Sequence, residues 1–230
     1  MGKNQEIAHA TVFSIYMSNI DQRVVHAQKQ CVDAVLPKGW TFYQHLHVPS
    51  KGELYPHATA LTNCLNSSAN YNDVTIFLDI DCIPLSTEAF LFLYDNASRG
   101  ILAGAVQRAN HINNDYHLYV GPFCLGLSKK KYEELGSPTF KETSRGDVAE
   151  ELTYCWQAKN QPLAFLWPSS VYEPRWSLNF DIKFGLGTTY GTAGISPYMF
   201  YHTFNARDPK LQEMFITKCN EILKQNEAMA

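Results

Sequence analysis

Hydrophobic and polar positions in the first half of the chain follow two alternating patterns. Short runs of apolar, β-branched and aromatic residues predict strands at 10–16, 40–48, 74–78 and 101–106. Between these runs, apolar residues recur with helical spacing, which predicts helices at 21–36, 56–65 and 86–96. Because strands and helices alternate, the pattern predicts an α/β fold with a central, mostly parallel mixed sheet flanked by helices.

The second half is patterned less regularly. It predicts strands at 119–127, 162–167 and 198–204, and helices at 128–135, at 147–159 and from Asp208 to the C-terminal region. Segment 185–197 contains four glycines and little periodicity, so we expect a mobile loop there that could act as a lid. No repeat or linker interrupts the sequence, and we therefore expect one domain over residues 1–230.

Composition narrows the function classes without selecting one. The chain has 230 residues, 45% of them hydrophobic and 18% charged, which suits a well-cored globular domain. Its net charge is −3 and no run of Lys and Arg is longer than 129–131, so we expect no general nucleic-acid binding. The six cysteines form no C-x-x-C pair, which indicates reduced thiols. The sequence shows no signal peptide and no membrane span, and we expect a cytoplasmic protein.

Two carboxylates follow the most apolar predicted strand. Asp79 and Asp81 are two residues apart, so in an extended chain their side chains point the same way, with Cα atoms roughly 6.6 Å apart. Such a pair can share one hard cation at the carboxyl end of a strand, where α/β folds place ligand sites. The alternative is that one aspartate caps the next helix or turn and the other is solvated. The ligand site is favoured because buried carboxylates are costly without a partner.

The sequences NCLN at 63–66 and VTIFLDIDCIPL at 74–85 resemble the centre of a GT-A glycosyltransferase, a Rossmann-like α/β fold. In that family the D-x-D motif holds Mn²⁺ or Mg²⁺ together with the diphosphate of a nucleotide-sugar. The resemblance implies that Asp81 is a direct metal ligand and that Asp79 contacts the ribose or reaches the metal through water.

The same resemblance implies further residues on the donor side. Asn63 falls where the family places an asparagine beside the donor. Tyr16 and Ser18, at the end of the first predicted strand, would line the nucleotide base. The second predicted strand lacks the acid that many relatives use to read the base, so the nucleotide stays open.

Two downstream segments extend the resemblance. RGDVAEEL occupies the place where the family opens a helix with an acidic pair, which makes Asp147 the candidate general base. Because Gly146 stands where an acid usually precedes the base, Glu150 and Glu151 are alternatives, and a helix N-cap is an equal reading of Asp147. MFYHTF resembles the closing strand that supplies a third metal ligand, here His202, and imidazole suits Mn²⁺ better than Mg²⁺.

The resemblance implies a metal-dependent hexosyltransferase with a nucleotide-sugar-binding half (1–110) and an acceptor-binding half (111–230) that carries the lid loop and the C-terminal helix. The donor would be a UDP-sugar, with a GDP-sugar as the alternative, and the acceptor a glycan or glycoprotein. If Asp147 is the base, transfer inverts the anomeric configuration.

Two other functions fit parts of the pattern. A phosphatase resembling haloacid dehalogenases would use Asp79 as nucleophile, Asp81 as general acid and a lysine of 129–131 as its cation. A non-catalytic sugar-nucleotide-binding module would bind the donor without turnover and would tolerate substitution of Asp147.

Overall fold

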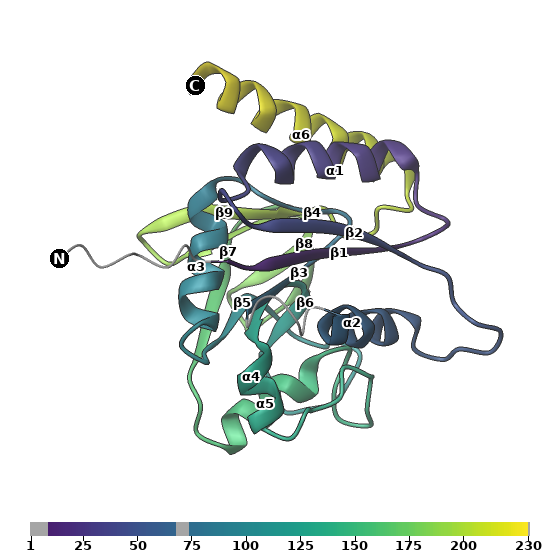
Figure 1. Cartoon of the computed structure of the whole chain (residues 1–230), viewed down its shortest axis with the longest axis vertical. Coiled ribbons are helices and arrows are strands. Elements are labelled where there is room, and N and C mark those ends of the chain that lie inside the picture. The colour runs from purple at the N-terminus through teal and green to yellow at the C-terminus, as the bar shows by residue number, and fades with distance from the viewer. Residues whose placement is uncertain (1–8, 68–73, 230) are drawn as a thin grey trace.

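The computed structural model describes residues 9–67 and 74–229, in which a mixed sheet has helices on both faces (Figure 1). The strands are β1 (Thr11–Met17), β2 (Thr41–His47), β3 (Val74–Asp79), β4 (Cys82–Pro84), β5 (Leu102–Gln107), β6 (Tyr119–Ser128), β7 (Leu163–Ser177), β8 (Lys183–Thr192) and β9 (Ser196–His202). The helices are α1 (Gln22–Val35), α2 (Pro56–Ser67), α3 (Thr87–Ala97), α4 (Lys129–Glu134), α5 (Glu150–Ala158) and α6 (Pro209–Met229). The strand order is β2-β1-β3-β6-β5-β7-β8-β9-β4.

Pairing in the sheet is less parallel than the sequence pattern predicts. β1 pairs in parallel with β2 and β3, and β5 with β7. The other pairs are antiparallel. β6 pairs with both β3 and β5, β7, β8 and β9 follow one another as a meander with short turns, and β4 pairs with β9. The predicted α/β fold with a mixed sheet is confirmed. The prediction that the sheet is mostly parallel is wrong, because most of its strand pairs are antiparallel.

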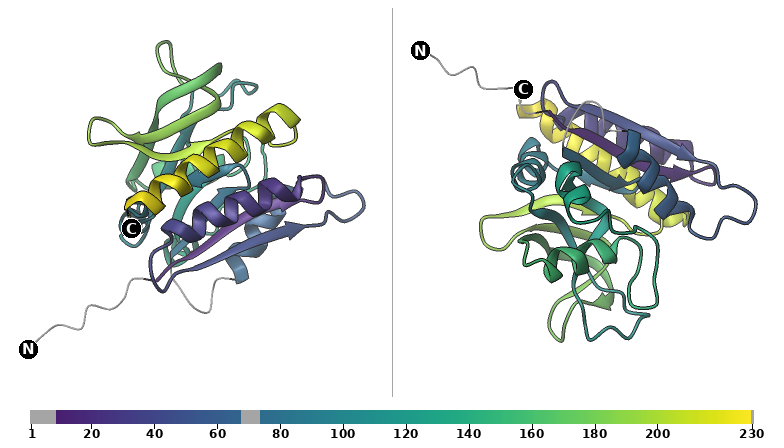
Figure 2. Two further views of the ribbon diagram at one scale, coloured as in Figure 1. Left: turned by 90° about the horizontal axis from the view of Figure 1, so that it is seen from above. Right: turned by 60° about the horizontal axis from the view of Figure 1, so that its bottom comes forward.

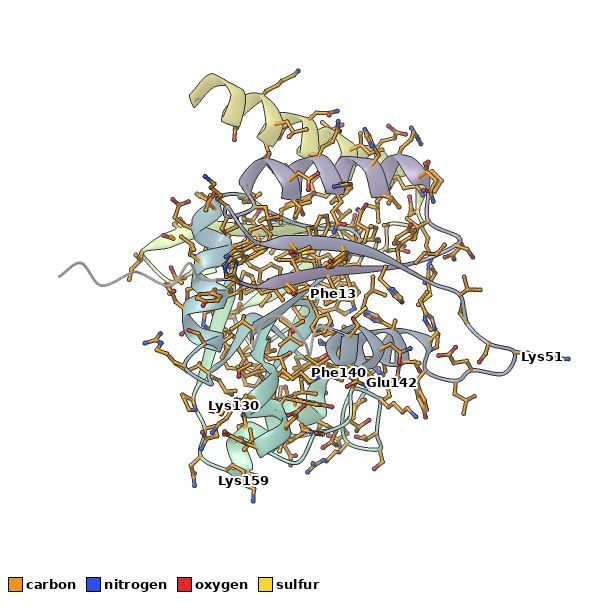
Figure 3. All side chains as sticks on the ribbon, in the orientation of Figure 1. Phe13, Lys51, Lys130, Phe140, Glu142 and Lys159 are labelled. Carbon is orange, nitrogen blue, oxygen red and sulfur yellow. The ribbon has the colours of Figure 1, made fainter. Side chains whose placement is uncertain are left out.

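The central strands contribute to separate cores on their two faces. On β1, Val12 packs into the same core as Phe90 of α3, whereas the next residue, Phe13, packs into the core that contains Phe140. Phe13 and Phe140 are labelled in the interior in Figure 3, while Lys51 lies at the tip of the loop between β2 and α2. Burial of both faces explains why these strands are continuous apolar runs rather than alternating ones.

Helices α1 and α6 lie side by side over one face of the sheet (Figures 1 and 2). As predicted, Asp208 precedes the last helix: its Oδ1 accepts a hydrogen bond from the Lys210 backbone N–H at 2.8 Å. The six cysteines form no disulfide, and all but Cys155 are buried. None of the helices in the described ranges has both the length and the apolarity to cross a membrane.

The prediction of a mobile loop at 185–197 is wrong, because most of this segment forms the antiparallel strands β8 and β9. Its glycines let neighbouring strands approach closely. A Cβ on Gly185 would lie 2.2 Å from the carbonyl oxygen of Glu173, and one on Gly191 would lie 2.3 Å from that of Ser196. These glycines therefore mark tight strand packing, and the expected lid is not formed by this segment.

Candidate active site

The two aspartates lie where β3 turns into β4. Asp79 is the last residue of β3, and Asp81 follows it in the turn. The buried Gln28 side chain holds this turn, since its Nε2 donates to the carbonyl oxygens of Asp79 (2.7 Å) and Cys82 (2.9 Å). Gln44 Nε2 in turn donates to Gln28 Oε1 at 3.1 Å, which orients the Gln28 amide. The carboxylates are thus carried on a supported turn.

His202 reaches the aspartates through strand pairing. It ends β9, where it lies opposite Cys82 of β4. Its Nε2 is 3.1 Å from Asp81 Oδ1 and 4.0 Å from Asp79 Oδ2. The imidazole ring stacks on Phe123 at a centroid distance of 4.3 Å, which fixes its plane. The structure therefore brings together the three side chains that the sequence proposes as metal ligands.

These three side chains form a donor set that fits a divalent cation. One oxygen of each carboxylate and one imidazole nitrogen all lie within 4.8 Å of one another. Carboxylate oxygens suit Mg²⁺ and Mn²⁺, and an imidazole nitrogen shifts the preference toward Mn²⁺.

A strained turn after β9 completes the surroundings of Asp81. Phe204 and Asn205 have φ angles of 58° and 66°, a left-handed conformation that is costly for a phenylalanine. This turn brings the backbone N–H of Ala206 to 3.1 Å from Asp81 Oδ2. It also carries the exposed Arg207 to the same edge of the sheet.

His57, in the first turn of α2, is a site residue that sequence reasoning missed. Its Nε2 lies 3.3 Å from Asp79 Oδ1. Burial favours neutral His57 and neutral Asp79. The charge attraction and the hydrogen bond between the two side chains favour the charged forms and outweigh the effect of burial. The pKa of His57 is therefore raised and that of Asp79 is lowered. The signal available in the sequence was position, since His57 opens the helix that follows a parallel strand and so lies at the same sheet edge as Asp79.

A first cavity of about 290 Å³ opens beside the aspartates. Its lining includes Tyr16, Met17, Ile20, His57, Asp79, Asp81, Asn205 and Arg207. Ser18, although next to this lining, is exposed and does not contribute to it. Asn63 is exposed farther along α2 and is not among the lining residues either, whereas His57 of the same helix is.

Asp147 lies in the segment before α5. The alternative N-cap role is wrong: α5 begins at Glu150 with Ala149 as its cap residue, and Asp147 Oδ1 instead accepts from the Val148 N–H at 2.7 Å. Its Oδ2 accepts a hydrogen bond from the Tyr119 hydroxyl at 3.3 Å. Burial, together with the nearby charge of Asp147, raises the pKa of Tyr119 well above its usual value, so this hydroxyl remains a donor at neutral pH.

A second cavity of about 430 Å³ has Asp147 in its wall. Its other lining residues are Gln107, Arg108, Asn110, His111, Trp176, Phe184 and Phe204. The two cavities are neighbours, because Phe204 of the second directly precedes Asn205 of the first. The charge of Asp147 also contributes to the raised pKa of His57, which lines the first cavity.

The two glutamates considered as alternatives to Asp147 are engaged elsewhere. Glu150 is fully buried and its Oε1 accepts from His117 Nδ1 at 2.7 Å. Glu151 accepts from Arg145 Nε at 2.8 Å and from the Thr143 hydroxyl at 2.9 Å. Neither lines the second cavity, where Asp147 is the acidic residue of the wall.

Comparison of the whole structure with solved structures finds glycosyltransferases. No protein-family model matches the sequence, and no curated protein does. The catalytic domain of Drosophila β1,4-galactosyltransferase 7 in complex with xylobiose is similar over 91% of this chain and 79% of that chain, with a TM-score of 0.52 and 13% identity. A mutant of that enzyme, in complex with manganese, UDP-Gal and xylobiose, is similar over 86% and 71%, also with a TM-score of 0.52 and 13% identity. Galactosyltransferase LgtC, in complex with donor and acceptor sugar analogues, is similar over 94% and 95%, with a TM-score of 0.50 and 12% identity.

At these identities the likeness establishes the fold. The chain has the α/β fold of GT-A nucleotide-diphospho-sugar glycosyltransferases, as the D-x-D segment led us to expect. Two of the three lysines that a phosphatase could use, Lys129 and Lys131, contact other groups. Lys129 Nζ donates to the Leu65 carbonyl at 3.4 Å, and Lys131 pairs with Glu134 at 3.5 Å. Neither lysine lines the cavity beside the aspartates.

Proposed function

We propose that the chain transfers a sugar from a nucleotide-diphosphate-sugar to a hydroxyl group of an acceptor glycan or glycoprotein, in a metal-dependent and inverting reaction. The observation that carries this proposal is the cluster of Asp79, Asp81 and His202 in a GT-A fold. Both aspartates line the first cavity, and Asp147 lines the adjoining one.

The first cavity takes the donor. Asp79, Asp81 and His202 hold Mn²⁺ or Mg²⁺, which when bound supplies positive charge against the departing diphosphate. Arg207 at the rim adds a fixed positive charge for the same phosphates. Tyr16 offers an aromatic surface to the nucleotide. A UDP-sugar is the favoured donor, supported by the UDP-Gal in the complex of the similar Drosophila enzyme, and a GDP-sugar is the alternative.

The second cavity takes the acceptor. Trp176 and Phe184 provide apolar faces of the kind on which sugar rings pack. Asp147 accepts the proton of the attacking hydroxyl, and the Tyr119 hydroxyl orients the carboxylate through its hydrogen bond to Oδ2. Direct attack from this side, with the leaving diphosphate in the neighbouring cavity, inverts the anomeric configuration.

Binding and turnover test the proposal separately. Titration calorimetry with UDP, GDP and their sugars, in Mn²⁺, Mg²⁺ or EDTA, should show metal-dependent binding that is lost in Asp79→Asn. Incubation with the bound donor and a panel of glycans should yield a glycosylated product, and Asp147→Asn should retain donor binding while losing turnover. Absence of metal-dependent nucleotide binding would refute the proposal. Binding without turnover under any condition would favour the non-catalytic module.

A further inference from the structure

We infer that the second cavity accepts a saccharide that carries an anionic group, a carboxylate or a phosphate, and that Arg108 recognises this group. The inference rests on the proposed transferase function only in treating the bound saccharide as the acceptor. Binding of the saccharide itself needs neither a donor nor a metal.

Arg108 directly follows the last residue of β5. It is half-buried in the wall of the second cavity. Its Nε is buried and has no hydrogen-bond partner within residues 9–67 and 74–229. Among the residues that the structure describes, Arg23, Arg145 and Arg175 form ion pairs with carboxylates and Arg108 does not. A guanidinium is always charged, so partial burial without a counter-ion leaves strong donors available to a ligand.

The guanidinium of Arg108 contacts an aromatic ring. Its central carbon lies over the Tyr116 ring, 3.9 Å from the ring centroid, a cation–π contact that uses none of the guanidinium N–H groups as hydrogen-bond donors. Tyr116 has a φ of 61°, in the left-handed region that aromatic residues rarely adopt. A conformation with this cost persists only where the surroundings enforce it, and here it places an aromatic ring on the arginine.

Side-chain hydrogen bonds hold the backbone around Arg108 in place. Asn110 Nδ2 donates to the Arg108 carbonyl oxygen at 3.0 Å, and Asn110 Oδ1 accepts from the Ser177 backbone N–H at 3.2 Å. The segment after β5 is thereby joined to the end of β7, which also carries Trp176 of the cavity wall. The positive group is preorganised relative to an aromatic wall.

Charged groups and aromatic surface both line the second cavity. Asp147 and Arg108 line the same cavity but form no ion pair. One can therefore receive a hydroxyl proton while the other binds an anion of the same ligand. Beside Arg108, Tyr116 and Phe180 have ring centroids 6.2 Å apart and are 58% and 92% exposed, which extends the aromatic surface beyond the cavity. A saccharide with an acidic substituent matches both the aromatic surface and the guanidinium of Arg108.

Three small sugars test this inference by ligand-observed NMR titration of the whole chain. Methyl β-glucuronide presents a carboxylate, glucose 6-phosphate presents a phosphate, and methyl β-glucoside is the neutral control. We expect at least one anionic sugar to bind roughly tenfold or more tightly than the glucoside, the size of effect that a charge-assisted hydrogen bond provides. Which of the two binds more tightly distinguishes a carboxylate acceptor from a phosphorylated one.

Arg108→Gln should reduce this preference to about twofold or less. Arg99→Gln, which removes an exposed arginine near the other end of β5, should leave it unchanged. If Arg108→Gln does not fold, the wild-type protein still tests the preference for an anionic sugar, because added NaCl should weaken binding of the anionic sugar and not that of the glucoside. Equal affinities for all three sugars in the wild type, or a preference that survives Arg108→Gln, would overturn the inference.

The outcome is separable from that of the proposed function. A preference for anionic sugars without any transfer would leave the inference standing and count against catalysis. Transfer to neutral acceptors without a preference for anionic sugars would support catalysis and overturn the inference.

Discussion

His202 Nε2 lies 3.1 Å from Asp81 Oδ1, although 121 positions separate the two residues in the chain. The contact depends on β9 pairing with β4, which places His202 opposite Cys82. The set of three ligand atoms is therefore complete only when β9, the last strand in the chain, pairs with β4. A cation bound there would link the β3–β4 turn to the end of β9.

Replacing His202 with alanine should weaken Mn²⁺ binding. The variant loses one of three donor atoms, so we expect a loss of at least about tenfold, the effect typical even of outer-shell partners. Calorimetry or Mn²⁺ electron paramagnetic resonance measures the affinity directly. His26→Ala, on the exposed face of α1, is the matched control and should bind as the wild type does. Equal affinity in His202→Ala and the wild type would remove His202 from the ligand set.

Replacing Glu150 with glutamine should destabilise the fold and disturb Asp147 without any contact to substrate. Glu150 accepts from His117 Nδ1 and Asn114 Nδ2, both at 2.7 Å, and from the Asp147 backbone N–H at 2.9 Å. In glutamine, an NH₂ group replaces one of the two carboxylate oxygens, so a donor would face a donor in a buried position. We expect this to cost about 3 kcal/mol of unfolding free energy. Denaturant unfolding measures this cost. The exposed Glu142, labelled in Figure 3, gives the control Glu142→Gln, which should change stability by less than about 0.5 kcal/mol. A stable Glu150→Gln variant would show that the network does not support the Asp147 segment.

The parts of the site that the sequence predicts correctly are those carried by one local pattern. The apolar run of β3 ends at Asp79 in the structure, so a buried strand followed by two acids was readable directly. The position of His202 came from a resemblance, because nothing in its own neighbourhood shows that β9 pairs with β4. His57 was not predicted, since its partner Asp79 is distant in sequence and a lone histidine at a helix start has many other roles.

The errors in the fold have a physical cause as well. Glycine marks flexible turns and also marks strands whose backbones approach closely, and local sequence does not distinguish the two. At Gly185 and Gly191 the second cause applies. The insertion of β6 between β3 and β5 is likewise a long-range pairing choice. It turns an expected parallel neighbourhood into an antiparallel one without changing the apolar pattern.

Alanine substitutions in the β7–β8–β9 meander should separate strand glycines from a turn glycine. Gly191→Ala places a Cβ 2.3 Å from the Ser196 carbonyl oxygen, which requires strand separation and should cost about 3 kcal/mol or more. Gly194 lies in the turn between the strands with a φ of 80° and open space around its Cβ position, so Gly194→Ala should cost only about 1 kcal/mol of backbone strain. Thermal and denaturant unfolding give both values. A neutral Gly191→Ala, combined with a changed turnover rate, would restore the mobile-lid interpretation.

The pairing of Glu151 with Arg145 should make stability depend on pH in one direction. The hydrogen bond from Arg145, against an opposing effect of burial, lowers the pKa of Glu151 below its usual value. A carboxyl group with a lowered pKa in the folded state contributes stability that is fully present above its unfolded pKa of about 4.3 and is lost as the pH falls through the folded value.

Because the arginine side chain is 60% exposed, we expect Glu151→Gln to cost only about 1 kcal/mol at pH 7. Unfolding free energies of the wild type and Glu151→Gln should therefore converge as the pH is lowered below about 4. Glu133 is exposed on α4 and lies 3.8 Å from Lys129, so Glu133→Gln should follow the wild type at every pH. A difference for Glu151→Gln that stays constant down to acidic pH would mean that packing, and not the charge of Glu151, stabilises this segment.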